Sequence, residues 1–163
     1  GRSAGHGAVA FSLNESDRAE KIVKQRVNAR KVLVLRDEVS EKVLADSLCS
    51  EAWTLAEEGR LSARILVFCN SRDVAQKVYD GLVKSSKKSR VSVDVELFVG
   101  GRRIHERVDA ASRLLELGFI AGSTIPRSSA VFLVATSAAE VGVDLDADHM
   151  VSDLVAWERM VQR

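Results

Sequence analysis

Arg64-Ile65-Leu66-Val67-Phe68-Cys69 is an apolar run with a single charge at its start, and the polar residues Asn70 and Ser71 follow it directly. Such a run, rich in β-branched and aromatic side chains, is typical of a strand buried on both faces, as the strands of parallel sheets are. Ser71 is a favoured helix N-cap, and apolar residues recur at helical spacing after it. A buried strand that turns directly into a helix is therefore the unit from which the fold is predicted.

Strands and helices alternate along the chain on both sides of this unit. Besides residues 64–69, the predicted strands are Ala8–Leu13, Lys31–Leu35, Val91–Val99, Val131–Ala135 and Met150–Val151. Predicted helices begin after Asn14 or Ser16, at Ser40, after Ser71, after Gly100-Gly101 and at Trp157. The alternation predicts an α/β domain of three layers, in which about six mostly parallel strands carry helices on both faces.

Three local expectations follow from this pattern. The core of the domain is expected to contain Ile65, Val67, Val93, Val95, Val131 and Leu133. Gly59 is placed to end the helix that opens at Ser40 in a left-handed turn. The polar stretch Lys84–Arg90 is interpreted as a solvated connector, with contact to a nucleic-acid backbone as the alternative.

The composition indicates a single domain in the cytoplasm. The 163 residues are 46% hydrophobic and 29% charged, which suffices for one packed core. The net charge of +1 marks no polyanionic partner, so any nucleic-acid contact must be local. The longest apolar run, Ala130–Ala135, is too short to span a bilayer, and we expect no membrane contact. Cys49 and Cys69 are isolated in sequence, which favours reduced thiols over a disulfide.

The loop after the predicted strand Val131–Ala135 carries the strongest functional signal. Thr136 follows the strand directly, and Glu140, Gly142 and Asp144 come after a turn of small residues. A threonine hydroxyl can donate to a phosphate oxygen, a glycine allows a close turn, and an aspartate can accept from a ribose hydroxyl. A loop that merely caps itself is the alternative, because these residue types are common at strand ends.

Three motifs, in order, resemble those of superfamily 2 helicases. Residues 136–144 resemble motif V, Val67–Arg72 resembles motif IV, and Trp157–Arg163 resembles the start of motif VI. The resemblance covers residues 8–163 and implies the second RecA-like domain of such a helicase, with residues 1–7 as a linker or loop. In the family, motif VI continues through a glycine to the arginines that reach the γ-phosphate. The domain is therefore expected to be truncated inside motif VI.

Within superfamily 2, the sequence is most similar to the CRISPR-associated helicase-nucleases of type I systems. The segments that carry this similarity are Ala138–Asp148, Asp153 and Trp157–Arg163. Leu97–Arg107 also resembles the family's segment after motif IV, and this resemblance implies a role for Arg102 or Arg103; an exposed arginine-rich helix start is the alternative. The resemblance implies a DNA translocase in antiviral defence, with any nuclease domain elsewhere in the parent protein.

The resemblance implies two groups of site residues. Contacts to the backbone of single-stranded DNA are expected from Ser71, Arg72, Arg102 and Thr136. The cleft that holds ATP is expected to be lined by Gly142, Asp144, Gln162 and Arg163. Phosphate contacts hold a strand without reading its bases, so specificity would have to come from a partner, which in this family is a guide-RNA surveillance complex.

No phosphate loop of the form G-x-x-x-x-G-K-[ST] occurs in the sequence. ATP and Mg²⁺ are therefore expected to be bound mainly by a first RecA-like domain of the same parent, and no catalytic residue is assigned within this chain. Asp37-Glu38 resembles a magnesium-binding motif, but we interpret the two residues as a pair of acids near a helix start. His6, His105 and His149 lack the spacing of metal ligands, so no metal site is assigned.

Three alternatives to this interpretation stay open at the level of sequence. One is a RecA-like domain without catalytic function that uses its surfaces for protein contacts. Another is the same domain from a different superfamily 2 DNA or RNA helicase. A nucleotide-binding flavodoxin-like domain is the third, and it is disfavoured because no glycine fingerprint follows the first predicted strand.

The purified chain alone should neither hydrolyse ATP nor bind it tightly, because the sequence contains no phosphate loop to cradle the phosphates. Isothermal titration calorimetry with ATP and Mg²⁺ measures this directly. Tight, magnesium-dependent binding would contradict the assignment to a second RecA-like domain.

Overall fold

The computed structural model of the chain describes residues 12–28, 30–36, 40–100, 111–121, 123, 128–137 and 144–163. The chain divides into two compact units, Gly1–Asp37 and Glu38–Arg163. The sequence pattern predicts a domain that begins at residue 8, so the predicted boundary and this division differ by residues 8–37.

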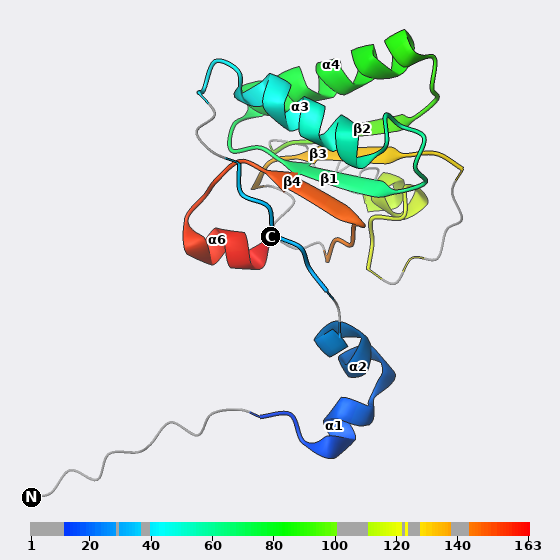
Figure 1. Ribbon diagram of the computed structural model, residues 1–163, viewed down its shortest axis with the longest axis vertical. Coiled ribbons are helices and arrows are strands. Elements are labelled where there is room, and N and C mark those ends of the chain that lie inside the picture. The colour runs from blue at the N-terminus through cyan, green and yellow to red at the C-terminus, as the bar shows by residue number, and fades with distance from the viewer. Residues whose placement is uncertain are drawn as a thin grey trace, which may run out of the picture. The chain divides into compact units, whose positions relative to one another are not determined.

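The second unit contains a sheet of four parallel strands (Figure 1). The strands are β1 (Arg64–Phe68), β2 (Asp94–Phe98), β3 (Val131–Ala135) and β4 (His149–Ser152). Their order across the sheet is β2-β3-β1-β4, and every pairing is parallel. The predicted α/β class with a parallel sheet is confirmed, with four strands in the described residues against the six expected.

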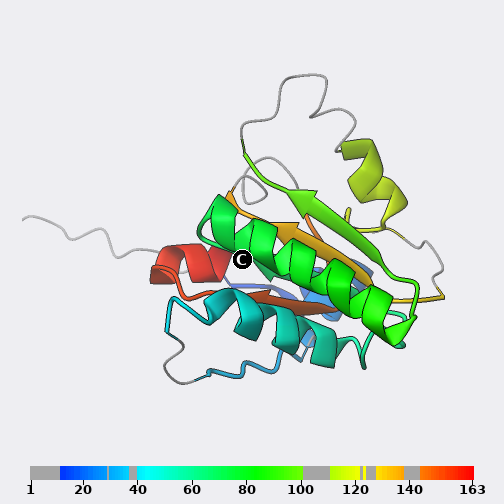
Figure 2. The same cartoon turned by 90° about the horizontal axis from the view of Figure 1, so that it is seen from above.

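Helices lie on both faces of this sheet. One face is covered by α3 (Leu44–Leu55) and α4 (Arg72–Ser89), which run side by side over the strands (Figure 2). The other face packs against helical residues 111–116 and the turn that follows them. Because side chains alternate along a strand, Ile65 and Val67 join the core under α3 and α4, whereas Leu66 and Phe68 join the other core. The three predicted layers are therefore present.

The predicted core is largely confirmed. Ile65, Val67, Val131 and Leu133 are buried, with at most 2% of their surface exposed. Val93 and Val95 are partly buried and pack against the same core as α3 and α4. The strand expected over Val91–Val99 is shorter than predicted, because β2 begins only at Asp94.

Gly59 lies in the turn after α3 with φ +84°, so its left-handed conformation is confirmed, but the helix ends earlier than predicted, at Leu55. A side chain there would be strained by this backbone conformation and would also be crowded, since a Cβ atom would lie 2.9 Å from Cγ1 of Val93. The turn at Gly59 thus lets α3 pack closely beside the chain that leads into β2.

The interpretation of Lys84–Arg90 as a connector is wrong. Helix α4 continues through Ser89, and Arg90 ends it in the left-handed region with φ 55°. Lysine is a good helix former, so a polar segment on the exposed side of a packed helix extends it without adding apolar periodicity. The hydroxyl of Ser86 donates to the carbonyl of Val91 at 2.6 Å and fixes the exit from the helix.

The first unit contains two short helices, α1 (Glu15–Ala19) and α2 (Lys21–Asn28). Asn14 caps α1 as predicted, and its side chain accepts from the Asp17 N–H at 2.7 Å. The strand predicted over Lys31–Leu35 is wrong: these residues have no regular structure, and 88% of Val32 is exposed. A β-prone run becomes a strand only where a neighbour supplies its hydrogen bonds, and none of the four strands pairs with this run.

Of the other predicted elements, β3 and β4 lie where Val131–Ala135 and Met150–Val151 were expected. The last helix, α6 (Trp157–Gln162), begins at the predicted residue. Residues 8–11 of the first predicted strand lie outside the described residues, as do Asp37 and Glu38. Within the described ranges, no helix is both long and apolar enough to cross a membrane.

Arg64 fixes the amino-terminal edge of the sheet. Its guanidinium donates to Oδ1 and Oδ2 of Asp148 at 3.0 and 3.1 Å, to Asp146 at 3.2 Å and to the Gly118 carbonyl at 2.8 Å. The hydrogen bond from Arg64 holds the pKa of the Asp148 carboxyl below its ordinary value. The segment that leads into β4 is thereby tied to the start of β1, on the edge opposite to the strands' carboxyl ends.

Replacing Val67 with aspartate should unfold the second unit. Val67 is fully buried between Val134 and Val151 of the neighbouring strands, so Val67→Asp would bury an unpaired carboxylate at a cost of roughly 4 kcal/mol or more. Thermal melting followed by circular dichroism measures the loss. Val32→Asp is the matched control, because 88% of Val32 is exposed and its replacement should leave the melt unchanged. An unchanged melting midpoint for Val67→Asp would show that β1 is not the central strand.

Candidate functional site

The register of the sheet gathers the carboxyl ends of three strands at one edge. Phe68 at the end of β1 is aligned with Ala135 of β3 and with Ser152 of β4. The hydrogen bonds continue past the strands: the Cys69 N–H donates to the Ala135 carbonyl at 2.8 Å, and the Asp153 N–H to the Phe68 carbonyl at 3.3 Å. We call the residues that follow β1, β3 and β4 at this edge, 69–72, 136–137 and 153–154, the carboxyl-end rim.

Ser71 and Arg72 occupy the part of the rim after β1. Ser71 caps α4, and its Oγ accepts from the Val74 N–H at 3.2 Å. Both Ser71 and Arg72 are exposed. Because the cap uses Ser71 Oγ only as an acceptor, the hydroxyl hydrogen of this residue can donate to a ligand.

Thr136 occupies the part of the rim after β3. Its N–H donates to the Phe98 carbonyl at 3.1 Å, which holds it at the end of the strand. Thr136 is buried, with 8% of its surface exposed. Ser71 and Thr136 thus follow adjacent strands on the same edge of the sheet.

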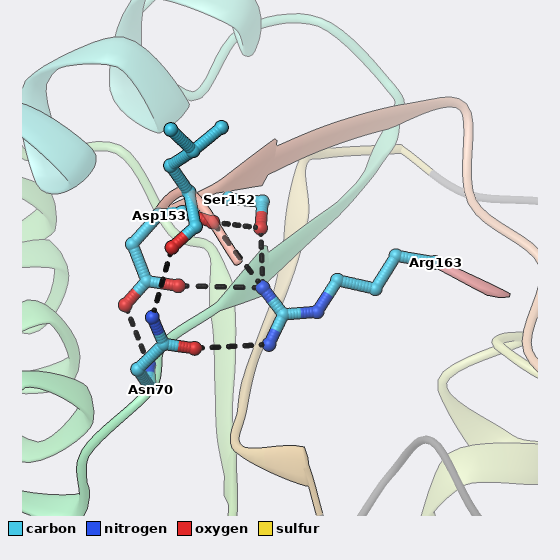
Figure 3. Close-up of polar contacts among 5 residues, drawn as sticks. Asn70, Ser152, Asp153 and Arg163 are labelled. Carbon is cyan, nitrogen blue, oxygen red and sulfur yellow. Dashed lines mark hydrogen bonds and ion pairs between the residues drawn. The ribbon is translucent and has the colours of Figure 1, made fainter. Parts of the chain in front are cut away.

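A group of polar side chains surrounds a buried ion pair at the ends of β1 and β4 (Figure 3). The guanidinium of Arg163 is at its centre: Nη1 donates to Ser152 Oγ at 2.6 Å and to Asp153 Oδ1 at 3.3 Å, and Nη2 donates to Asn70 Oδ1 at 3.3 Å. The guanidinium also lies over the ring of Phe68, 4.8 Å from its centroid. The Arg163 side chain has no exposed surface, and 5% of the Asp153 side chain is exposed.

Asp153 joins this group to the backbone after β1. Its Oδ2 accepts from the Asn70 N–H at 2.6 Å, while its Oδ1 faces Arg163. The Asn70 side chain donates in turn to the Leu154 carbonyl at 3.2 Å. Charges buried in this way are tolerated only when they are paired and hydrogen-bonded, as both are here. We refer to Asn70, Ser152, Asp153 and Arg163 as the buried polar cluster, after the buried ion pair of Asp153 and Arg163 at its centre; Asn70 itself is exposed and Ser152 is half-buried.

Cys69 lies next to the buried polar cluster and is itself fully buried. The pKa of its thiol is raised to about 12, mainly by burial and also by the negative charge of Asp153, while the positive charge of Arg163 opposes both effects. The thiol is therefore protonated at neutral pH and is not a nucleophile there.

The remaining predicted site residues are placed as follows. Asp144 is exposed, its carbonyl accepts from the Ala121 N–H at 3.0 Å, and the segment after it leads to Arg64 at the amino-terminal edge. Gln162 is in α6, but the position of its side chain is outside what the structure describes. Gly142 and Arg102 lie outside the described residues. The expected roles of these four residues stay predictions.

The sequence did not indicate that Asn70 and Ser152 are hydrogen-bond partners of Arg163. A usable signal is present, because a polar pair follows an apolar strand twice, as Asn70-Ser71 and as Ser152-Asp153. The contacts of Asn70 with Asp153 and Arg163 join residues 83 or more positions apart, which no local pattern predicts. The guanidinium contacts of Arg163 given above are all within the domain, and its predicted place in the ATP cleft stays a prediction.

No group of three or more His, Cys, Asp or Glu side chains in the described part of the chain is arranged to hold a metal ion. The polar side chains at the rim are hydroxyls, an amide, the guanidinium of Arg72 and the carboxylate of Asp153, which pairs with Arg163. Such groups hold phosphates and position neighbouring segments.

A parallel sheet between two helical layers, with polar residues gathered at the carboxyl ends of its strands, defines a RecA-like α/β domain. Residues 62–163 match the family described as "CRISPR-associated nuclease/helicase Cas3, C-terminal", and the chain belongs to this family. The match contains β1 to β4, the carboxyl-end rim and the buried polar cluster. No curated protein matches the chain.

Solved structures of T. fusca Cas3 have the same fold. The crystal structure of T. fusca Cas3-ATP is 22% identical with a TM-score of 0.62, over 78% of this chain and 14% of that one. The crystal structure of T. fusca Cas3 is 24% identical with a TM-score of 0.60, over 79% of this chain and 14% of that one. The chain therefore spans about one seventh of the length of these proteins.

Cys69 should resist alkylation in the folded protein because its thiol is fully buried and has a pKa of about 12. Iodoacetamide labelling followed by mass spectrometry should modify the partly buried Cys49 first and Cys69 only after unfolding in guanidinium. Labelling of Cys69 at the same rate in native and unfolded protein would show that the end of β1 is open to solvent.

Proposed function

We propose that this chain is the second motor domain of an ATP-dependent DNA translocase, in a CRISPR-associated nuclease/helicase that acts in antiviral defence in the cytoplasm. In this role the domain contacts the backbone of single-stranded DNA and completes an ATP site shared with a first RecA-like domain. The observation that carries the proposal is the carboxyl-end rim, where Ser71 and Thr136 follow adjacent strands within the segment that matches the family.

The residues on the rim after β1 can offer hydrogen-bond donors and positive charge to a DNA phosphate. Ser71 retains a hydroxyl hydrogen to donate, Arg72 beside it is exposed, and both lie at the amino end of a helix of 18 residues. Unpaired N–H groups and the helix dipole favour an anion at such an end. These groups complement a phosphate and provide no pattern that reads bases, so a guide-RNA surveillance complex would supply the choice of sequence.

The proposed ATP site lies mainly on the partner domain. A first RecA-like domain of the same parent would hold ATP and Mg²⁺, and this chain would contribute residues to the facing side of the cleft. Gly142, Asp144 and Gln162 are the candidates from the motif resemblance. In this arrangement the chain forms only one side of the ATP cleft, and the phosphate loop belongs to the other domain.

Replacing Thr136 with valine in the full-length parent should weaken the stimulation of ATPase activity by DNA. Valine keeps the branched shape and removes the hydroxyl, and a hydrogen bond to a charged phosphate contributes about 1.5–3 kcal/mol, or roughly a tenfold to hundredfold change in the DNA concentration needed for half-maximal activity. ATPase assays across a titration of single-stranded DNA measure the change, and thermal melting of the same preparation measures stability.

Thr54→Val is the matched control, because Thr54 is exposed near the end of α3 and the same atoms change there. A Thr136→Val protein that melts earlier but keeps full stimulation by DNA would show that the hydroxyl serves the fold alone. That result would remove Thr136 from the strand contacts and favour a domain that binds proteins only.

A further inference from the structure

Helix α6 has little that would hold it in place by itself. No side chain caps its amino end at Ala156, so the position of the helix depends on its tertiary contacts. The residue that directly follows α6 is Arg163, whose side chain turns into the domain and ends in the buried polar cluster.

The buried polar cluster ties α6 to two strands at once. Arg163 reaches Ser152 and Asp153 at the end of β4, and Asn70 after β1. Asp153 also links the end of β4 directly to the segment after β1, because it accepts a hydrogen bond from the Asn70 N–H. The segment after β1 therefore meets the distant segments β4 and α6 at one guanidinium (Figure 3).

The chemistry of this contact requires arginine. A planar guanidinium presents donors in a fixed fork and can lie flat on an aromatic ring, as Arg163 does over Phe68. A lysine ammonium is a compact point charge, without the planar fork that serves Asp153 and Asn70 and lies flat on the ring. For Arg163 to contact a nucleotide, it would have to leave Asp153 as a buried, unpaired carboxylate, which is strongly unfavourable.

We propose that Arg163 is a positioning residue, which docks α6 at the carboxyl ends of β1 and β4, and that it does not contact the nucleotide, in place of the role in the ATP cleft that the motif resemblance implied. The proposal deepens the proposed function, on which it rests for its effect on ATP hydrolysis. Asp153 and Asn70 orient the guanidinium, and the docked helix then holds the motif that resembles motif VI at a fixed place beside the carboxyl-end rim.

Arg163→Lys in the full-length protein separates positioning from nucleotide contact. Hydrogen exchange followed by mass spectrometry should show that the amides of α6 exchange faster by roughly tenfold to hundredfold, which is the size expected for losing hydrogen bonds to a charged group. The exchange rates of β3 should stay the same. In ATPase assays, kcat should fall while the KM for ATP stays the same. Ser152→Ala removes one acceptor without changing charge, so it should loosen α6 in the same direction by less, and it provides a milder variant if Arg163→Lys does not fold.

Glu158→Gln is the control within α6, because Glu158 is exposed and lies outside the buried polar cluster. A raised KM for ATP with unchanged exchange in α6 would overturn the proposal and place Arg163 at the nucleotide. Equal acceleration of exchange in α6 and β3 would also overturn it, because the contact would then stabilise the whole domain. Selective loosening of α6 in a parent that has no ATPase activity would support the positioning role and contradict the proposed function.

Discussion

The parallel register of β1 between β3 and β4 is the constraint on which the rest of the domain depends. Phe68 is aligned with Ala135 on one side and Ser152 on the other, so the chain leaves three neighbouring strands at the same level. Side chains that are far apart in sequence are thereby brought to one edge. A slip of one residue in β1 would turn Ile65 and Val67 away from α3 and α4 and would move Asn70 away from Asp153.

The same register makes a buried ion pair possible. Arg163 and Asp153 are both removed from water, and they are compensated by Ser152, by Asn70 and by the ring of Phe68. Their charges act on the neighbouring Cys69, where Asp153 adds to the rise in pKa caused by burial. The edge therefore has two levels: an exposed one that can meet a ligand, and a buried one that holds α6.

Much of the fold could be predicted from sequence because burial on both faces leaves a continuous apolar run, as in β1 and β3. The prediction for Lys31–Leu35 failed because β propensity does not specify a pairing partner, and that for Lys84–Arg90 failed because a polar helical extension resembles a loop. The motifs indicated Ser71 and Thr136, whose neighbouring strands bring them to one edge. They did not indicate that Arg163 points inward, since its partners Asn70 and Asp153 are specified only by the tertiary fold.

In the proposed function, DNA lies across the carboxyl ends of the strands. A photo-crosslinking amino acid placed at Arg72, on the carboxyl-end rim, or at Arg60, an exposed arginine just before β1 begins, compares the two edges directly. With radiolabelled single-stranded DNA and the full-length protein, we expect a crosslink from position 72 and none from position 60. A crosslink from position 60 alone, or equal crosslinks from both, would contradict it.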